Sequence, residues 1–163
     1  MELLHEVIVS GGAVTSITTG TITGLSEGVV YKFEVGIKTA STTPNMSCDW
    51  FINGDSVETS YNRAYLNSKA GTAYDSDKTQ AGNVYQEMGV MTGFITVEDS
   101  YPMVNFLANQ YTTTTPTGKD CGALVWVTNT NHSGITEFEI TGSVASQIGN
   151  GSYLRIWEGI QSD

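Results

Sequence analysis

The sequence predicts an all-β fold: an antiparallel jelly-roll β-sandwich of about 8–10 strands. Short runs of alternating apolar and polar side chains recur about every ten residues, and no run has the period of a long helix. Charged residues make up only 15% of the chain, and its many Thr, Ser, Gly and Asn residues suit strands and turns. The alternating, aromatic segment 151–160 must pair inside a sheet, so the C-terminal strand closes the fold. An up-and-down barrel is the main alternative.

The N-terminal third contains the clearest strand pattern. A first strand is predicted over 3–9, and residues 13–25 predict a strand, a turn and a second short strand, because Gly20 and Gly24 interrupt them. Strict alternation over 29–39 predicts a half-buried antiparallel strand. The side chains expected to face its core are Val29, Tyr31, Phe33, Val35 and Ile37.

The middle of the chain is less regular. A strand over 46–52 leads into Asn53-Gly54-Asp55, a turn tripeptide that can adopt positive φ. Residues 55–83 are polar and contain several glycines, which predicts a long loop or a single helical turn. A strand follows over 88–98, in which Gly93 is expected to mark a bulge.

The C-terminal half predicts four further strands. They cover 101–107, 121–128, 136–140 and 151–160, with an extended loop over 111–118. In the last strand, the side chains expected to face the core are Leu154, Ile156 and Ile160. The side chains expected on the outer face, for binding or for contact with another subunit, are Tyr153, Arg155 and Trp157.

Length and charge limit the possible partners. The 163 residues predict one domain, 1–163, with enough core to fold without a metal or a disulfide. A net charge of −10 with only seven basic residues argues against nucleic acid and against an anionic membrane as partners. The N-terminus has neither the basic region nor the apolar run of a signal peptide, so we expect synthesis in a cytoplasm.

Residues that could act in catalysis or metal binding lack the sequence patterns that these functions require. His5 and His132 lie in no nucleophile signature, and Cys48 and Cys121 are expected to be buried hydrophobes rather than a disulfide. The acidic pair within 75–77 lacks the spacing of a calcium loop. No cofactor motif is present, so the prediction is a non-enzyme with no metal, no cofactor and no catalytic residues.

Four segments resemble phage virion proteins of the jelly-roll type. They are the strand 31–35, the strand and turn 51–55, the segment 61–62 and the C-terminal strand 151–160, which together span most of the chain in order. The C-terminal segment departs from the family pattern at Trp157-Glu158, where the family more often has Leu-Tyr. The candidate interface or fold-motif residues are Asn53, Asp55, Tyr61, Tyr153, Arg155 and Trp157.

That resemblance implies a capsid decoration (cementing) protein of a bacteriophage. The implied protein is a homotrimer in the virion, made in the host cytoplasm, whose partner is the major capsid protein. One alternative is a tail or fibre adhesin that binds glycans through Trp157 and loop aromatics. Another is a carbohydrate-active enzyme, for which Glu137 and Glu139 would be the first carboxylates to test.

Overall fold

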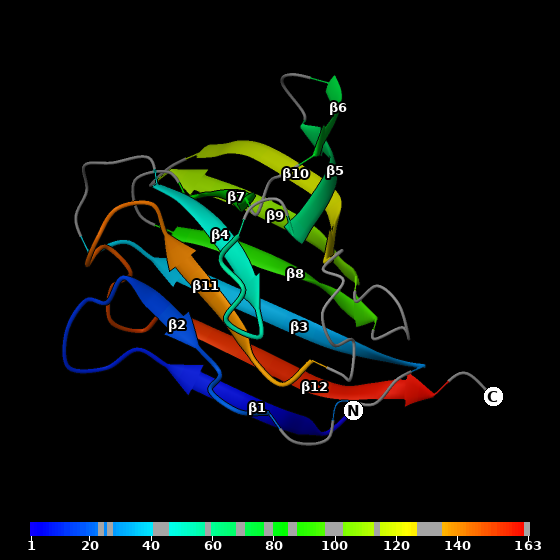
Figure 1. The fold of residues 1–163 in the computed structure, drawn as a ribbon. Helices are drawn as coiled ribbons and strands as arrows, with labels where there is room; N and C mark the ends of the chain where they lie inside the picture. The colour runs from blue at the N-terminus through cyan, green and yellow to red at the C-terminus, as the bar shows by residue number, and fades with distance from the viewer. Residues whose placement is uncertain are drawn as a thin grey trace.

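The computed structural model describes residues 1–22, 25, 28–40, 46–57, 60–67, 71–76, 80–84, 88–96, 103–112, 115–126 and 135–161. Within these residues the chain forms twelve strands and two antiparallel sheets (Figure 1). The strands are β1 (Leu3–Ile8), β2 (Ser16–Thr18), β3 (Val29–Lys38), β4 (Met46–Ile52), β5 (Tyr61–Asn67), β6 (Gly71–Ser76), β7 (Gln80–Val84), β8 (Met88–Thr96), β9 (Met103–Thr112), β10 (Thr115–Trp126), β11 (Phe138–Gly142) and β12 (Tyr153–Gln161).

Eight of these strands form a jelly roll. The larger sheet has the order β1-β12-β3-β8-β9-β10-β5-β6, and the smaller sheet has the order β2-β11-β4-β7. Consecutive strands of the described chain lie in different sheets except in two places, the pair β5–β6 and the run from β8 to β10, while β4 and β7 are neighbours within the smaller sheet. The resulting antiparallel pairs, β1 with β12, β2 with β11, β3 with β8 and β4 with β7, are those of two Greek keys wound together. The predicted fold class is therefore confirmed, including the pairing of the C-terminal strand.

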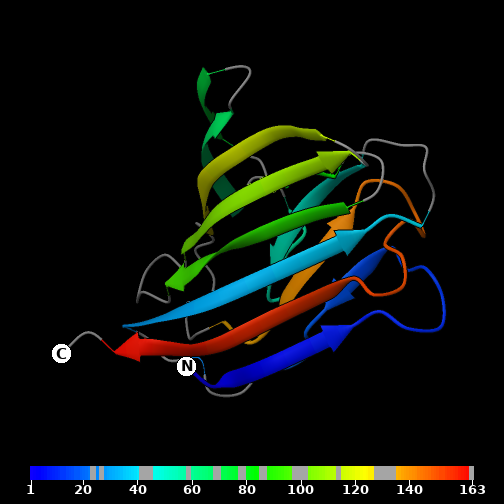
Figure 2. The same cartoon turned by 180° about the vertical axis from the view of Figure 1, so that it is seen from behind.

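Two additional hairpins widen the larger sheet. The β9–β10 hairpin pairs beside β8, and the β5–β6 hairpin pairs beside β10 (Figure 1). The strands found in the described residues therefore exceed the expected number, because both hairpins lie outside the eight-strand jelly roll. Figure 2 shows the larger sheet from its outer side, with β1, β12, β3 and β8 in sequence across it.

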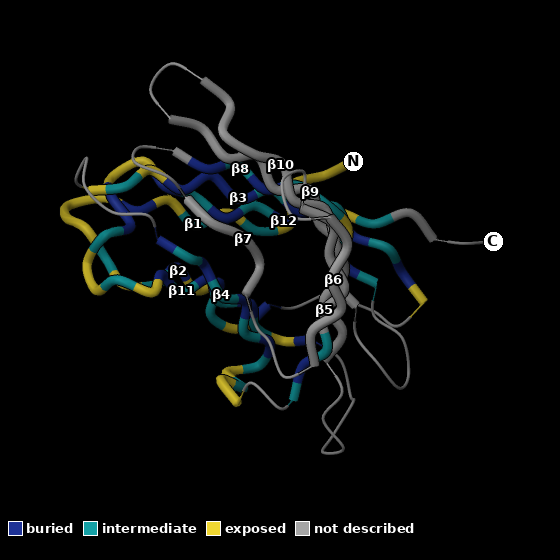
Figure 3. Tube along the Cα trace, turned by 90° about the horizontal axis from the view of Figure 1, so that it is seen from above, coloured by how far each residue is buried: buried dark blue, intermediate teal, exposed yellow. Residues whose placement is uncertain are grey.

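The core lies between the two sheets. Trp50 from the smaller sheet packs edge-on against Phe33 and Phe138, with ring centroids 5.0 and 5.7 Å apart. All three side chains are fully buried, and the indole Nε1–H of Trp50 lies 3.1 Å from the sulfur of Met91. The alternation over β3 is as predicted, because its five core-facing side chains are all buried. In Figure 3 the two sheets are seen as two layers, with buried residues on the strands and exposed residues in the turns and at the N-terminus.

Some local predictions were wrong. Residues 55–83 contain β5, β6 and the start of β7, and the expected loop over 111–118 contains the ends of the β9–β10 hairpin. Residues 19–22 form no second short strand after β2, and residues 23 and 24 of the expected strand lie outside the described residues. The two expected loops that are strands share one cause: a polar segment can be a strand when its backbone pairs with an existing sheet, whatever its side-chain alternation.

Gly93 marks no bulge. Its register with Phe33 and with Phe106 continues without a shift on either side. A Cβ at this position would overlap the backbone carbonyl of Asn105, so the strand needs glycine because two backbones approach closely here.

Candidate interaction surface

The C-terminal strand presents one side to the core and the other to solvent, as predicted. Leu154 and Ile156 are fully buried between the sheets. Tyr153, Arg155 and Trp157 lie half-buried on the opposite side of β12. The side chain of Ile160 lies outside the described residues. We call the solvent side of β1, β12, β3 and β8 the outer face. Its described side chains are Leu3, Glu6, Ile8, Tyr153, Arg155, Trp157, Val30, Lys32, Glu34, Lys38, Val90, Thr92, Phe94 and Thr96.

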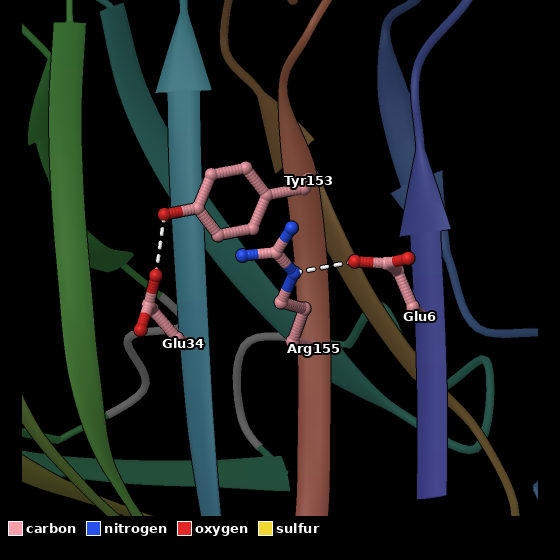
Figure 4. A network of polar contacts seen from close by, with 4 residues as sticks. All are labelled: Glu6, Glu34, Tyr153 and Arg155. Atoms are coloured by element: carbon pink, nitrogen blue, oxygen red, sulfur yellow. Dashed lines mark hydrogen bonds and ion pairs between the residues drawn. The ribbon is translucent and has the colours of Figure 1, made fainter. Parts of the chain in front are cut away.

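A polar network crosses three strands of this face (Figure 4). The Tyr153 hydroxyl donates a hydrogen bond to Glu34 on β3, and Arg155 Nε donates one to Glu6 on β1. The Arg155 guanidinium also lies over the ring of Tyr153, 4.3 Å from its centroid. The side chains of Arg155 and Glu6 are each 33% exposed, so solvent screens this ion pair and its main effect is to fix geometry.

An apolar row lies beside the polar network. The register places Leu3 opposite Trp157, Trp157 opposite Lys32, and Lys32 opposite Phe94. The Lys32 ammonium sits 4.7 Å from the Trp157 ring centroid, and this cation–π contact holds the indole against the sheet. At the two ends of the row, Leu3 is 45% exposed and Phe94 is 50% exposed. Apolar surface therefore remains open to a partner on both sides of the fixed indole.

Tyr153 is positioned by a glycine on the neighbouring strand. Gly36 lies opposite Tyr153, and a Cβ there would overlap the phenol ring. The absence of a side chain lets the ring lie flat across β3 and reach Glu34. Ile8, on the other side of Tyr153, is 50% exposed. Ile8 and the ring of Tyr153 therefore form a second apolar row on the outer face, beside the row of Leu3, Trp157 and Phe94.

The outer face lacks the acidic excess of the whole chain. Its charged side chains are two acids, Glu6 and Glu34, and three bases, Lys32, Lys38 and Arg155, whereas the whole chain carries −10. Desolvation and the hydrogen bond to Glu34 raise the pKa of Tyr153 to about 12. The hydrogen bond to Glu6 raises the pKa of Arg155 further above its usual value. At neutral pH Tyr153 is therefore a protonated phenol and Arg155 a cation, and the hydrogen bonds to Glu34 and Glu6 fix the position of each.

The other three predicted site residues form a separate structural corner at the end of β4. Tyr61 is fully buried, and its hydroxyl oxygen accepts the backbone N–H of Ile52 at 2.9 Å and donates to the carbonyl of Asp55 at 2.6 Å. Burial raises the pKa of Tyr61 above its ordinary value, which keeps the phenol protonated. The backbone N–H of Asp55 closes the turn onto the Ile52 carbonyl at 3.0 Å.

Asn53 joins this corner to the strand beside it. It adopts a φ of 53° and is followed by Gly54 at 71°, as the turn tripeptide predicts. Its side-chain oxygen accepts the backbone N–H groups of Thr136 at 2.7 Å and Glu137 at 3.1 Å. Asn53 also donates its own backbone N–H to the Glu137 carbonyl at 2.9 Å. The structure thus separates the six predicted residues into a corner within the fold and a group on the outer face.

The described part of the chain places several other candidate reactive residues. Cys48 is buried and free, and burial raises its pKa to about 12, so its thiol is no nucleophile. Glu137 and Glu139 are half-buried, and Glu139 accepts a hydrogen bond from the hydroxyl of Thr141. Nε2 of His5 is buried without a hydrogen-bond partner. His132 and Asp77 lie outside the described residues, as does the side chain of Cys121.

Neither a metal-binding group nor a membrane-spanning helix occurs in the described part of the chain. There, no three His, Cys, Asp or Glu side chains lie close enough together to hold a metal ion. Over the same residues, no helix has the length and apolar character needed to cross a bilayer.

Sequence reasoning identified the outer-face residues of β12 and missed those on the other strands. Glu6, Lys32 and Glu34 lie beside β12, but the register that brings them there joins positions more than a hundred residues apart. Phe94 on β8 joins the face through its register with Lys32 on β3. The alternation in 29–39 could have indicated two of these residues. Lys32 and Glu34 lie on the exposed side of that segment, between apolar neighbours in the sequence.

Comparison with known proteins assigns no family. No family model matches the chain, and no curated protein matches it. Among solved structures, the chain is similar to the carbohydrate recognition domain of Emp47p, with a TM-score of 0.31 and 8% identity over 97% of this chain and 82% of that one. This likeness is too weak to indicate a family or a function.

Proposed function

We propose that the chain is a non-enzymatic structural protein of a virion that binds the outer capsid lattice through its outer face. The observation that carries this proposal is the arrangement of Trp157, Tyr153 and Arg155 beside exposed apolar side chains on one sheet surface. Trp, Tyr and Arg are the residue types that dominate the binding energy of protein interfaces. An acidic chain also approaches a large partner most easily through a surface that lacks the acidic excess of the rest of the chain.

Preorganisation supports a docking role for this face. The contacts of Lys32 with Trp157 and of Arg155 with Tyr153 already restrain four long side chains before any partner arrives. Ordering such side chains on binding would otherwise cost about 0.5–1.5 kcal/mol each. A restrained surface therefore retains more of its contact energy as affinity, which suits a protein that must stay on a particle.

The virion context comes from the resemblance of the 51–55 and 151–160 segments to phage jelly-roll proteins. In this proposal the major capsid protein is the partner, and several associated copies of this chain engage several capsid subunits at once. Each added contact raises the overall avidity without requiring a new kind of interaction. The protein is made in the host cytoplasm, joins the shell and stabilises it by bridging neighbouring capsid subunits.

The test uses particles purified from cells that carry the gene. Quantitative mass spectrometry should find peptides of this chain at a copy number that scales with that of the major capsid protein. Particles made with Trp157→Ala or Phe94→Ala should lose the chain and break more readily on heating. Val57→Ala is the matched control, because Val57 is 56% exposed but lies outside the outer face. Particles that contain no such peptides, or that keep both variants at full copy number, would refute the proposal.

A second candidate function is glycan binding by a tail or fibre adhesin. The observation that favours it is the half-exposed ring of Phe94, which lies opposite Asn105 on the neighbouring strand. An exposed aromatic ring beside a side-chain amide can stack on a sugar ring and hydrogen-bond its hydroxyl groups. Binding on a glycan array that disappears in Phe94→Ala, with particle copy number unchanged, would support this function over lattice binding.

A further inference from the structure

The larger sheet ends at β1, an edge strand with an open side. In the described part of the chain, β12 is the strand that pairs with β1. The backbone of Val9 directs both of its groups toward the β12 side: its N–H donates to Ser152 at 2.8 Å and its carbonyl accepts from Gly151 at 3.0 Å. Successive residues of an antiparallel strand alternate in this direction. The N–H and C=O groups of Ile8 and Glu6 therefore point away from the sheet.

This edge lacks the features that usually prevent strands from pairing with other chains. Residues 3–8 contain no lysine, arginine or proline. The single acidic side chain, Glu6, accepts a hydrogen bond from Arg155 on β12, so its charge is directed toward the sheet and not toward the open edge. The one register irregularity lies between Leu3 and His5, so the part from Glu6 to Ile8 stays regular. By contrast, the edge strand β2 of the smaller sheet is only three residues long.

Apolar side chains flank the open edge. Ile8 is 50% exposed and Leu4 is 38% exposed, while Val7 on the inner side is half-buried against the core. A strand added here would cover these groups and continue both faces of the sheet. The edge thus combines unpaired backbone groups with apolar surface on each side of them.

We propose that β1 pairs antiparallel with β1 of a second copy of this chain, across a two-fold axis near Val7. In this register, Glu6 lies opposite Ile8 of the second copy and Ile8 lies opposite its Glu6. Their outward N–H and C=O groups then form two reciprocal hydrogen-bonded pairs. Val7 faces Val7 of the second copy at the axis, where side chains come closest. This register also keeps the two Glu6 carboxylates from facing each other directly, which would be unfavourable.

The second copy is favoured as the occupant because the edge is self-complementary. An antiparallel pairing about a two-fold axis uses the same donors and acceptors on both chains. Two copies that each carry −10 repel each other over most of their surface, but at this edge the one acid already has a cationic partner. The contact is separate from lattice binding and does not depend on it.

The test uses the purified full chain and three variants. Sedimentation equilibrium should give a mass that rises with concentration from 17.5 kDa toward twice that value. Ile8→Lys places a charge at the edge, and Ile8→Pro removes an outward N–H; each should weaken dimerisation about tenfold or more. Phe94→Lys is the matched control, since Phe94 is equally exposed on the same face but away from the edge. It should leave the dimer unchanged, and circular dichroism confirms that each variant is folded.

Hydrogen exchange identifies the strand involved. In the dimer the backbone amides of Glu6 and Ile8 should exchange more slowly than in the monomer, and in the Ile8→Lys variant the Glu6 amide should exchange fast at all concentrations. A chain that stays monomeric at every concentration overturns the proposal. So does an oligomer in which these amides remain unprotected, including a trimer of three times 17.5 kDa, or a dimer that Phe94→Lys disrupts as strongly as Ile8→Lys. None of these outcomes bears on particle binding, which the particle experiments measure separately.

Discussion

The phenol oxygen of Tyr61 accepts a hydrogen bond from the buried backbone N–H of Ile52, at 2.9 Å. Tyr61 begins β5 in the larger sheet, and Ile52 ends β4 in the smaller sheet, so this bond ties the two layers together where the chain crosses between them. The same hydroxyl donates to the carbonyl of Asp55 and so closes the turn. In immunoglobulin-like sandwiches, the tyrosine corner likewise uses a tyrosine hydroxyl to hydrogen-bond to the backbone a few residues upstream.

Tyr61→Phe should lower the free energy of unfolding by about 1–3 kcal/mol, because it leaves the buried N–H of Ile52 without a partner. Tyr153→Phe is the matched control. It removes a hydroxyl bonded to Glu34 on the half-exposed outer face, where water can replace the lost bond, so the loss should stay below about 1 kcal/mol. Urea denaturation of both variants measures the difference. Equal losses would mean that the corner contributes no more than a surface contact.

Substitutions at Asn53 should separate its backbone role from its side-chain role. Asn53→Gly keeps the positive φ but loses the oxygen that accepts the N–H groups of Thr136 and Glu137. Asn53→Asp keeps an acceptor and tolerates the same φ. We expect Asn53→Asp to be the most stable of the variants, Asn53→Gly to lose about 1–2 kcal/mol, and Asn53→Ala to lose more, because it adds backbone strain. Thermal unfolding gives the order, and a fully stable Asn53→Ala would contradict this interpretation.

Gly93→Ala should destabilise the larger sheet strongly, by about 2 kcal/mol or more, since the new methyl group would overlap the carbonyl of Asn105. Gly12→Ala is the control, because a Cβ there has no neighbour within 4 Å. That variant should change stability by less than about 0.5 kcal/mol. Denaturant midpoints report both effects. A tolerated Gly93→Ala would mean that β8 and β9 are further apart than described.

Alkaline pH should destabilise the protein. Burial raises the pKa of Cys48 from 9.0 to about 12, and that of Tyr153 rises from 10.0 to about 12. Above pH 9 the unfolded chain loses protons that the folded chain keeps, so stability is full below that pH and falls between pH 9 and about 12. Cys48→Ala should make this fall shallower, as measured by denaturation at a series of pH values. A slope unchanged by the substitution would exclude Cys48 as a contributor.

The sequence predicted those strands that bury one face in the core, because this burial requires apolar and polar side chains to alternate. Residues 29–38 and 153–157 are examples, because a polar side chain on their inner side would have no water or partner. The β5–β6 hairpin could not be found in this way. Its segment mixes polar and apolar residues without strict alternation, so the sequence predicts a loop. The register with β10 supplies the backbone hydrogen bonds that make it a strand pair.

The candidate site was predictable only along one strand. Tyr153, Arg155 and Trp157 follow from the alternation of β12 alone. Their partners Glu34 and Glu6 lie 119 and 149 residues away along the chain, and only the strand order of the jelly roll brings them into contact. Local patterns carry no information about that order, so neither the network nor the exposed position of Phe94 beside it could be anticipated.

Hydroxyl-radical footprinting of purified particles tests most directly whether the outer face is the binding surface. Side-chain oxidation is compared between the chain bound on particles and the same chain free in solution. Trp157, Tyr153 and Phe94 should be oxidised several-fold less on particles, while the exposed Val57 should be oxidised equally in both. Equal oxidation of the three aromatic side chains in the two states, or protection confined to other parts of the chain, would contradict the proposed role of the outer face.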